Sequence, residues 1–439
     1  MILPLILNEM VTKERILEMK RAHSEELAQF REKLYVRPRL RQLFFELTLK
    51  CNEACFHCGS SCGAARPDGL PVEVYRAVLD EVKQNFDIRP LMLCITGGEP
   101  LLRPDFFEIL GYAHSQGFTW GMTSNATLIT PQVAHRLYES GMATISVSID
   151  GLEKTHDRLR GLDGGYRLAM EGIENLLAER DRRYAEPAVS PGQQENDQPV
   201  TGQQADWQHV NRPDQPVEGK RRKKPFRAIQ VTTVINHENI HELDALYAIF
   251  EKMDIDSWRV IGLEPIGRAL LRPELMLTPE DQRRLISFIY EKRCEQMPVT
   301  YGCSHFVGFD YEREIRDWYF LCNAGIYTAS IMANGDVGAC LDIERTPRTV
   351  QGNILETPFT EIWNKRFELF RRPLSRMCED CRDCSYERYC AGGAHHSFDY
   401  ESNRQRICLK GILFDEENLQ CLLPSLCSGG GADRCLRRA

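Results

Sequence analysis

Three cysteines at the end of one apolar run constrain this chain more than any other feature. Cys51, Cys55 and Cys58 follow the segment 42–49, whose apolar and aromatic residues predict a buried strand. A CxxxCxxC triplet supplies three thiolates to an iron–sulfur cubane, whereas an electron-transfer cluster normally has four cysteine ligands. The iron without a protein ligand is open to a small molecule, as is the open position of a catalytic zinc. A zinc site is the alternative that the short spacing leaves open.

Further strands end in polar residues. The run "LMLCITGGEP" predicts a strand that ends at Gly97, Gly98 and Glu99. There the glycines let the backbone approach a ligand closely, and the carboxylate is placed to meet an amino group. The runs "WGMTSNAT" and "ATISVSIDG" predict strands that end at 124–125 and 148–151. Helical patterns at 70–86, 105–117, 130–141 and 166–183 alternate with these strands, and "FRAIQVTTVIN" and "WRVIGLEPIG" predict two more strands. This alternation predicts βαβ units and a parallel sheet.

With its motifs in this order, the chain resembles the radical S-adenosylmethionine (SAM) enzymes over residues 41–268. The resemblance implies an α/β fold, a partial (β/α)6 barrel at 41–310 with its chemistry at the carboxyl ends of the strands. It also implies that Cys51, Cys55 and Cys58 hold a [4Fe–4S] cluster that cleaves SAM to a 5′-deoxyadenosyl radical. The residues implied in SAM binding are Gly97, Gly98, Glu99, Ser124, Asn125, Ser148 and Asp150. No further catalytic residue is assigned.

The C-terminal third holds a second field of cysteines: Cys322, Cys340, Cys378, Cys381, Cys384, Cys390 and Cys408. The sequence Asn334-Gly335-Asp336 predicts a hairpin turn, which would let Cys322 and Cys340 converge on one metal. Cys381, Cys384 and Cys390 are close enough along the chain to bind a second metal without a long loop closure. Taken alone, this spacing also suits zinc.

The same field resembles the SPASM extension of many radical SAM enzymes, which implies a small cysteine-rich domain at 311–420 with auxiliary [4Fe–4S] clusters. By that pattern the outer cluster is held by Cys381, Cys384, Cys390 and Cys408. The inner site has Cys322 and Cys340, but Ala394 stands where the family usually has a further cysteine. Candidates for the missing ligands are Cys303 and Cys378, and after them His395 and His396. We expect two auxiliary clusters, and one if the inner site is incomplete.

Composition limits the classes of partner and the cellular compartment that we expect for this protein. The net charge of −8 argues against nucleic-acid binding. No apolar segment approaches the roughly 20 residues needed to cross a membrane. Seventeen cysteines, grouped in short spacings without a recognisable secretion signal, indicate metal binding in a reducing cytoplasm.

Two terminal segments lie outside the two predicted domains, and one insertion interrupts the predicted barrel. For residues 1–40, the spacing of apolar residues predicts an amphipathic helical extension packed across the barrel. Residues 185–225 are rich in proline and polar residues and predict a disordered insertion. Residues 421–439, with Cys421, Cys427 and Cys435, predict a flexible tail.

Replacement of residues 186–224 by a short Gly/Ser linker is expected to leave solubility and SAM cleavage nearly unchanged, because the segment lacks apolar anchors. Formation of 5′-deoxyadenosine by the shortened protein measures this. Loss of folding on deletion would show instead that the segment packs against the barrel.

The resemblance also implies a substrate and partners. The segment "SIDGLEKTHDRLRGLDGGY" is similar to the peptide-modifying branch of the family. It implies hydrogen abstraction from a peptide or protein, in the maturation of a ribosomally made precursor, with flavodoxin or ferredoxin as electron donor. The alternatives are sulfatase maturation and haem modification. A further alternative, of another class, is a non-catalytic cluster-bearing protein that binds a peptide. Sulfatase maturases place an acidic base directly after the cysteine that matches Cys340, where this chain has Leu341 and then Asp342.

Overall fold

The computed structural model describes residues 3–185, 228–293, 295, 297–302, 305–316 and 319–414. Side chains are described from residue 15 on, except Ile16. Apart from Ala185, the predicted insertion lies outside the described residues, as do the predicted tail and Cys303.

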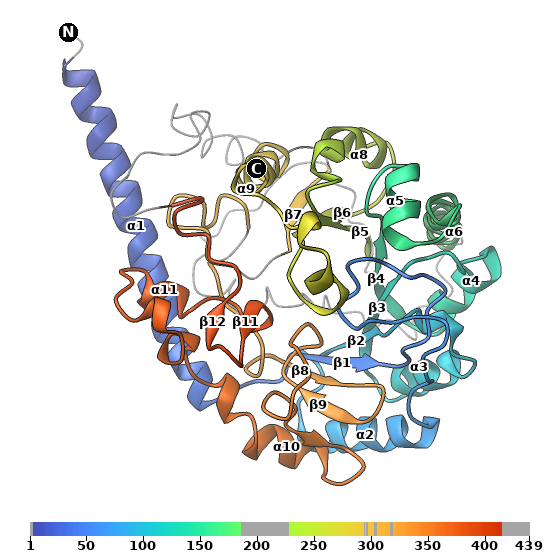
Figure 1. Ribbon diagram of the computed structural model, residues 1–439. Coiled ribbons are helices and arrows are strands. Elements are labelled where there is room, and N and C mark those ends of the chain that lie inside the picture. Colours follow the sequence, from blue (N-terminus) through green and yellow to red (C-terminus); the bar gives the residue numbers. More distant parts are fainter. Residues whose placement is uncertain are drawn as a thin grey trace.

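One curved sheet forms the body of the protein (Figure 1). Strands β1 to β7 are neighbours in chain order and run parallel, as the βαβ alternation predicts. The parallel strands are β1 (Gln42–Glu46), β2 (Met92–Thr96), β3 (Thr119–Ser124), β4 (Met142–Ser148), β5 (Ala228–Ile235), β6 (Ser257–Gly262) and β7 (Val299–Tyr301). The predicted α/β fold is therefore confirmed. The sequence analysis missed β7, because a strand of three residues carries almost no periodic signal.

Helices cover the outer side of this sheet (Figure 1). They are α2 (Val72–Asn85), α3 (Phe106–Ser115), α4 (Pro131–Glu139), α5 (Glu153–Arg160), α6 (Gly165–Ala185), α8 (Leu243–Phe250) and α9 (Pro279–Lys292). Helix α2 illustrates why: Tyr75, Val78, Leu79 and Val82 recur three and four residues apart and are all buried. The helical faces and the strands share one large hydrophobic core.

The C-terminal segment extends the same sheet. Strand β8 (Thr328–Ile331) pairs in parallel with β1, and β9 (Asp336–Gly338) and β10 (Gly352–Asn353) follow as antiparallel neighbours. The predicted hairpin is confirmed, and Gly335 adopts a φ of +91°, which favours glycine. Because β8 covers the edge of β1, the two parts of the chain share backbone hydrogen bonds. The rest of this segment holds α10 (Phe359–Lys365), α11 (Glu387–Cys390), β11 (Phe398–Asp399) and β12 (Arg404–Gln405).

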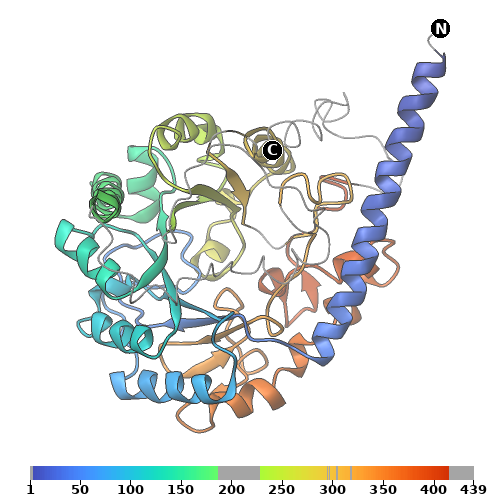
Figure 2. The same ribbon diagram turned by 180° about the vertical axis from the view of Figure 1, so that it is seen from behind.

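Helix α1 (Leu3–Val36) lies along the C-terminal segment and not, as we expected, across the barrel (Figures 1 and 2). The guanidinium of Arg31 donates to the carbonyls of Arg388 (2.6 Å) and Tyr389 (2.8 Å). Arg388 in turn forms ion pairs with Glu25 and Glu32. The helix is also docked by apolar packing, since Leu34 and Phe30 share a cluster with Leu321, Ile326 and Tyr327. The polar contacts with α11 leave no periodic pattern in the sequence.

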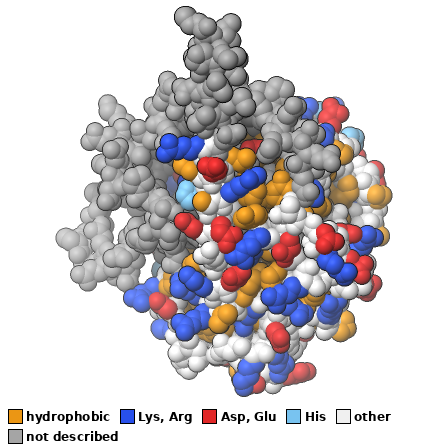
Figure 3. Space-filling model, turned by 90° about the vertical axis from the view of Figure 1, so that its left-hand side faces the viewer, with side chains coloured by type: hydrophobic (Ala, Val, Ile, Leu, Met, Phe, Trp, Pro, Cys, Tyr) orange, Lys and Arg blue, Asp and Glu red, His pale blue; other side chains and the backbone are white. Residues whose placement is uncertain are grey.

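On the described part of the α1 side of the molecule, acidic and basic side chains are interspersed (Figure 3). Among the helices that the structure describes, none combines the length and the apolar character that a membrane span requires. Neither observation identifies a partner.

Candidate active site

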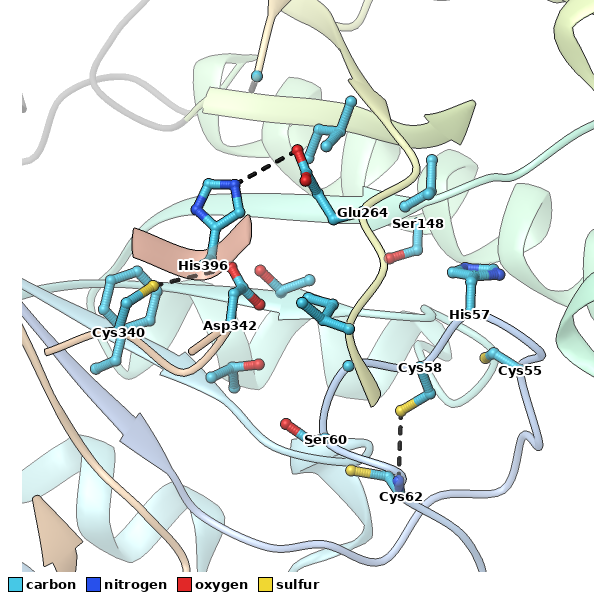
Figure 4. A pocket seen from close by; sticks show the side chains of 18 of the residues that line it. Cys55, His57, Cys58, Ser60, Cys62, Ser148, Glu264, Cys340, Asp342 and His396 are labelled. Atoms are coloured by element: carbon cyan, nitrogen blue, oxygen red, sulfur yellow. Dashed lines mark hydrogen bonds and ion pairs between the residues drawn. The ribbon is translucent and has the colours of Figure 1, made fainter. Parts of the chain in front are cut away.

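A cavity of about 430 Å³ lies where the carboxyl ends of the parallel strands meet the C-terminal segment (Figure 4). The strand side contributes residues from the loops after β1 to β4 and after β6. The C-terminal side contributes Cys322, Cys340, Asp342 and His396. Carboxyl-end loops of parallel strands are the usual place for binding and chemistry, so the cavity is the candidate active site.

The cysteine triplet lies on one wall of this cavity. Cys51, Cys55 and Cys58 all line it as free thiols, in the loop that follows β1. The loop is fixed from outside: Arg268 donates to the carbonyls of Cys55 (2.7 Å) and Cys62 (2.6 Å). The amide of Cys62 donates to the sulfur of Cys58 at 3.3 Å (Figure 4). Hydrogen bonds from Arg268 and from the amide of Cys62 thus hold the cysteine loop in place.

The surroundings of these thiols suit metal ligation. Burial raises the pKa of Cys51 to about 11 and raises that of Cys55 further, whereas a hydrogen bond with Cys62 lowers the pKa of Cys58 to about 5. Buried thiols of this kind become thiolates when a metal supplies the compensating charge. Free cysteines directed into a cavity with no fourth member of their motif fit a cluster with one open iron.

Cysteine separation also bears on the choice between zinc and a cluster. Among the described residues, the only group with three potential ligand atoms within 4.8 Å of one another contains no cysteine. One tetrahedral zinc would hold its thiolates about 3.8 Å apart, given Zn–S bonds of about 2.3 Å. Cysteines that bind different irons of a cubane lie farther apart. The described thiols therefore form no preassembled zinc site with three cysteine ligands.

The two glycines after β2 pack against the cysteine loop. A Cβ atom on Gly97 would lie 2.3 Å from the carbonyl oxygen of Thr48, and one on Gly98 would lie 1.9 Å from that of Lys50. The amide of Gly98 donates to Thr48 (2.7 Å), and the amide of Glu99 donates to Lys50 (2.9 Å). The glycines line the cavity, as expected of ligand contacts, but they also bring two backbone segments together.

Gly98→Ala is expected to lower SAM cleavage by at least about tenfold and to destabilise the protein by about 1–3 kcal/mol, because the added methyl group overlaps backbone. Formation of 5′-deoxyadenosine and thermal unfolding measure the two effects. Gly63→Ala, in the same cysteine loop, is the matched control, since a Cβ there meets nothing within 4 Å. Equal behaviour of the two variants would contradict the packing role of Gly98.

Glu99 lies behind the cavity wall. The residue is 1% exposed, and its carboxylate accepts from the hydroxyl of Ser124 (3.0 Å) and the amide of Asn125 (2.8 Å). Burial raises the pKa of Glu99 to about 7. Ser124 and Asn125 themselves line the cavity. The structure thus places Glu99 where it orients its neighbours, whereas Gly97, Gly98, Ser124, Asn125 and Ser148 face the cavity.

Asp150 belongs to a buried ionic network. It pairs with Arg160 (2.8 Å) and with His57 (3.0 Å), and Arg160 also pairs with Glu53 (2.7 Å). Although burial opposes ionisation, Arg160 and His57 hold the pKa of Asp150 well below its usual range. Backbone bonds from Ala54 and Phe56 to the end of α5 tie this network to the cysteine loop. Asp150 is thereby placed to position the loop.

The second cysteine field forms two groups. Cys322 and Cys340 both line the cavity, and each thiol pKa is raised by burial. The thiol of Cys378 contacts that of Cys381, so Cys378 lies with the outer cysteines. Electrostatic proximity places Cys384, Cys390 and Cys408 in that outer group as well. Electrostatic proximity also links Cys340 to Cys322.

Family models match two parts of the chain. Residues 45–199 match the radical SAM superfamily, and residues 322–385 match SPASM, an iron–sulfur cluster-binding domain. The chain is a radical SAM protein with a SPASM domain. These domains imply [4Fe–4S] clusters and SAM as cofactors, which agrees with the free thiols and the cavity described above.

Individual proteins agree with this assignment. The chain is 27% identical to "AdoMet-dependent heme synthase" of Methanosarcina barkeri, over 80% of this chain and 90% of the relative. It is 26% identical to "Mycofactocin maturase MftC" of Mycolicibacterium smegmatis, over 80% of this chain and 77% of that one. Streptococcus suis SuiB bound to precursor peptide SuiA has a similar fold, with a TM-score of 0.59 and 17% identity. The match covers 85% of this chain and 76% of SuiB. The structure of anSMEcpe with bound AdoMet and Cp18Cys peptide also has a similar fold, with a TM-score of 0.56 and 18% identity to this chain. The match covers 82% of this chain and 90% of that one.

Sequence reasoning missed several residues of this radical SAM site. Arg160 lies on a short polar helix, where a buried arginine has no local signature. Arg268, Glu264 and His305 follow β6 and β7 without any recognisable spacing to the cysteines. A polar residue just past a predicted strand was the only available signal, and it selects many positions besides these.

Proposed function

We propose that this radical SAM enzyme abstracts hydrogen from a peptide or protein substrate and matures a ribosomally made precursor. The proposal is carried by the cavity, which has the SAM motifs on one wall and the SPASM residues Cys322 and Cys340 on the other. A side chain threaded between these walls meets both. An external electron donor such as flavodoxin or ferredoxin is part of the proposal.

The chemistry divides between cofactor and protein. When bound, the cluster with SAM supplies one-electron chemistry that removes hydrogen from an unactivated C–H bond. The chain provides the surroundings: Ser124, Asn125 and Ser148 present polar atoms to the cavity, and Gly97 and Gly98 hold the cysteine loop against β2. A substrate that fills the cavity also keeps water and other hydrogen donors away from the reacting atoms.

The ionisable lining favours a peptide over a tetrapyrrole. The carboxylates of Glu53, Glu264 and Asp342 line the cavity, whereas its guanidinium groups are those of Arg160 and Arg259. Arg160 already pairs with two carboxylates. A ligand with several carboxylate side chains requires complementary positive charge. This lining supplies little of it.

Haem modification is the second candidate, and the similarity to "AdoMet-dependent heme synthase" favours it. A third candidate, sulfatase maturation, has support from Asp342, which lies in the cavity with its carboxylate 3.9 Å from the Cys340 thiol. Its position two residues after Cys340 departs from the maturase pattern, so we rank it below peptide maturation.

The test offers the anaerobically reconstituted enzyme three substrates in parallel: peptides encoded beside its gene, an iron tetrapyrrole with carboxylate side chains, and a sulfatase-derived cysteine peptide. We expect 5′-deoxyadenosine to accumulate with a mass change in a neighbouring peptide only. Modification of the tetrapyrrole or of the sulfatase peptide, with none of the neighbouring peptides changed, would overturn the proposal.

A further inference from the structure

Glu264, His305 and His396 form one group of side chains. Two of them, Glu264 and His396, line the cavity (Figure 4). The Nε2 atom of His305 lies 2.5 Å from Oε1 of Glu264, and the Nε2 atom of His396 lies 3.4 Å from the same oxygen. Their ligand atoms all lie within 4.8 Å of one another, and no other group of three in the described part of the chain does so.

Three separate segments supply these side chains. Glu264 follows β6 and His305 follows β7, so the adjacent parallel strands bring both to the same edge of the sheet. His396 comes from the SPASM domain, in a short 3-10 helix, His395–Ser397. The exposed fractions of the Glu264 and His305 side chains are 9% and 7%, and that of His396 is 15%. The group is therefore formed only when both domains are folded together.

An ordinary ion pair does not account for all of this group. The second carboxylate oxygen of Glu264, Oε2, is buried and has no hydrogen-bond partner. An unpaired buried oxygen is costly, by about 1–3 kcal/mol and more when it is charged. The two imidazoles direct their Nε2 atoms toward one carboxylate, with the ring planes tilted by 69°. Two imidazoles and one carboxylate with open positions form a recurring ligand set for divalent transition metals.

We propose that Glu264, His305 and His396 bind one divalent transition-metal ion, separate from the cysteine sites. Imidazole and carboxylate ligands suit zinc and ferrous iron, and a site with three protein ligands keeps a position open. Glu264 and His396 line the cavity, so that position faces it and can take an oxygen atom of a bound molecule. The proposal is independent of whether the substrate is a peptide or a tetrapyrrole.

The test uses the full-length protein with its clusters reconstituted and Zn²⁺ as the probe. After equilibration with Zn²⁺ and desalting, metal analysis counts zinc and iron separately, and zinc-edge X-ray absorption reports only the zinc ligands. We expect about one zinc per chain with nitrogen and oxygen neighbours at about 2.0–2.1 Å and no sulfur at about 2.3 Å. Glu264→Gln and His396→Ala should each lose this zinc and keep the iron. Asp342→Asn, on the same cavity wall but outside the group, should keep both metals.

The outcomes separate clearly. Zinc bound through sulfur, or no zinc retained by the wild-type protein, would overturn the proposal. Zinc retained equally by the wild-type protein and by folded Glu264→Gln and His396→Ala would overturn it as well. If a variant fails to fold, the wild-type absorption spectrum decides: a shell of nitrogen and oxygen supports the site, and a shell containing sulfur refutes it.

Discussion

Cys58→Ala is expected to abolish cleavage of SAM to 5′-deoxyadenosine in anaerobically reconstituted, dithionite-reduced protein. Cys58 is one of the three thiols that line the cavity, and a cubane with only two remaining thiolates in this loop is not held. The loss should exceed the roughly 10–100-fold that removal of an outer-sphere partner causes. Chromatographic assay of 5′-deoxyadenosine, together with iron content, measures it.

Cys62→Ser is the matched control for this experiment. Cys62 is 2% exposed and its thiol contacts that of Cys58, but it lies outside the CxxxCxxC motif. We expect the variant to keep its iron and most of its SAM cleavage. Persistent cleavage by Cys58→Ala, or loss of iron from Cys62→Ser alone, would show that a different set of thiols binds the cluster.

Arg160→Met is expected to destabilise the protein by about 3–5 kcal/mol, because it leaves the buried Glu53 carboxylate without its cation and Asp150 with His57 alone. The midpoint of urea unfolding at neutral pH measures this effect. Arg158→Met, two residues earlier on α5, is the matched control. Its ion pair with Glu238 is about half exposed, at 51% for the Arg158 side chain, and should contribute no more than about 1 kcal/mol. Equal destabilisation by the two variants would refute the network.

The difference between Arg160→Met and the wild-type protein should also depend on pH. Because the folded-state pKa of Asp150 is held below its ordinary value of about 3.9, the pair stabilises the protein fully above that value. The contribution is lost as the pH falls through the lower, folded-state pKa. Unfolding midpoints measured from neutral to strongly acidic pH should therefore converge. A gap that stays constant over this range would show that lost packing, and not lost charge pairing, causes the destabilisation.

Local patterns in the sequence determined much of this protein. The spacing of Cys51, Cys55 and Cys58 indicated a cluster with an open iron, and the period of apolar residues predicted strands β1 to β6. The turn at Gly335 was predictable because a positive φ favours glycine. Each of these features depends on neighbouring residues in the chain, so each leaves a local signature.

Only the tertiary structure decided which distant residues meet. It placed α1 along α11, joined β8 to β1, and put Arg160 between Asp150 and Glu53. It also brought His396 to Glu264 at the cavity. Such contacts link segments far apart in the chain, and the free energy that favours them comes from burial and charge pairing across the fold. The spacing of residues along the chain does not reveal these contacts. The sequence alone therefore indicated the cluster ligands but not the residues that surround them.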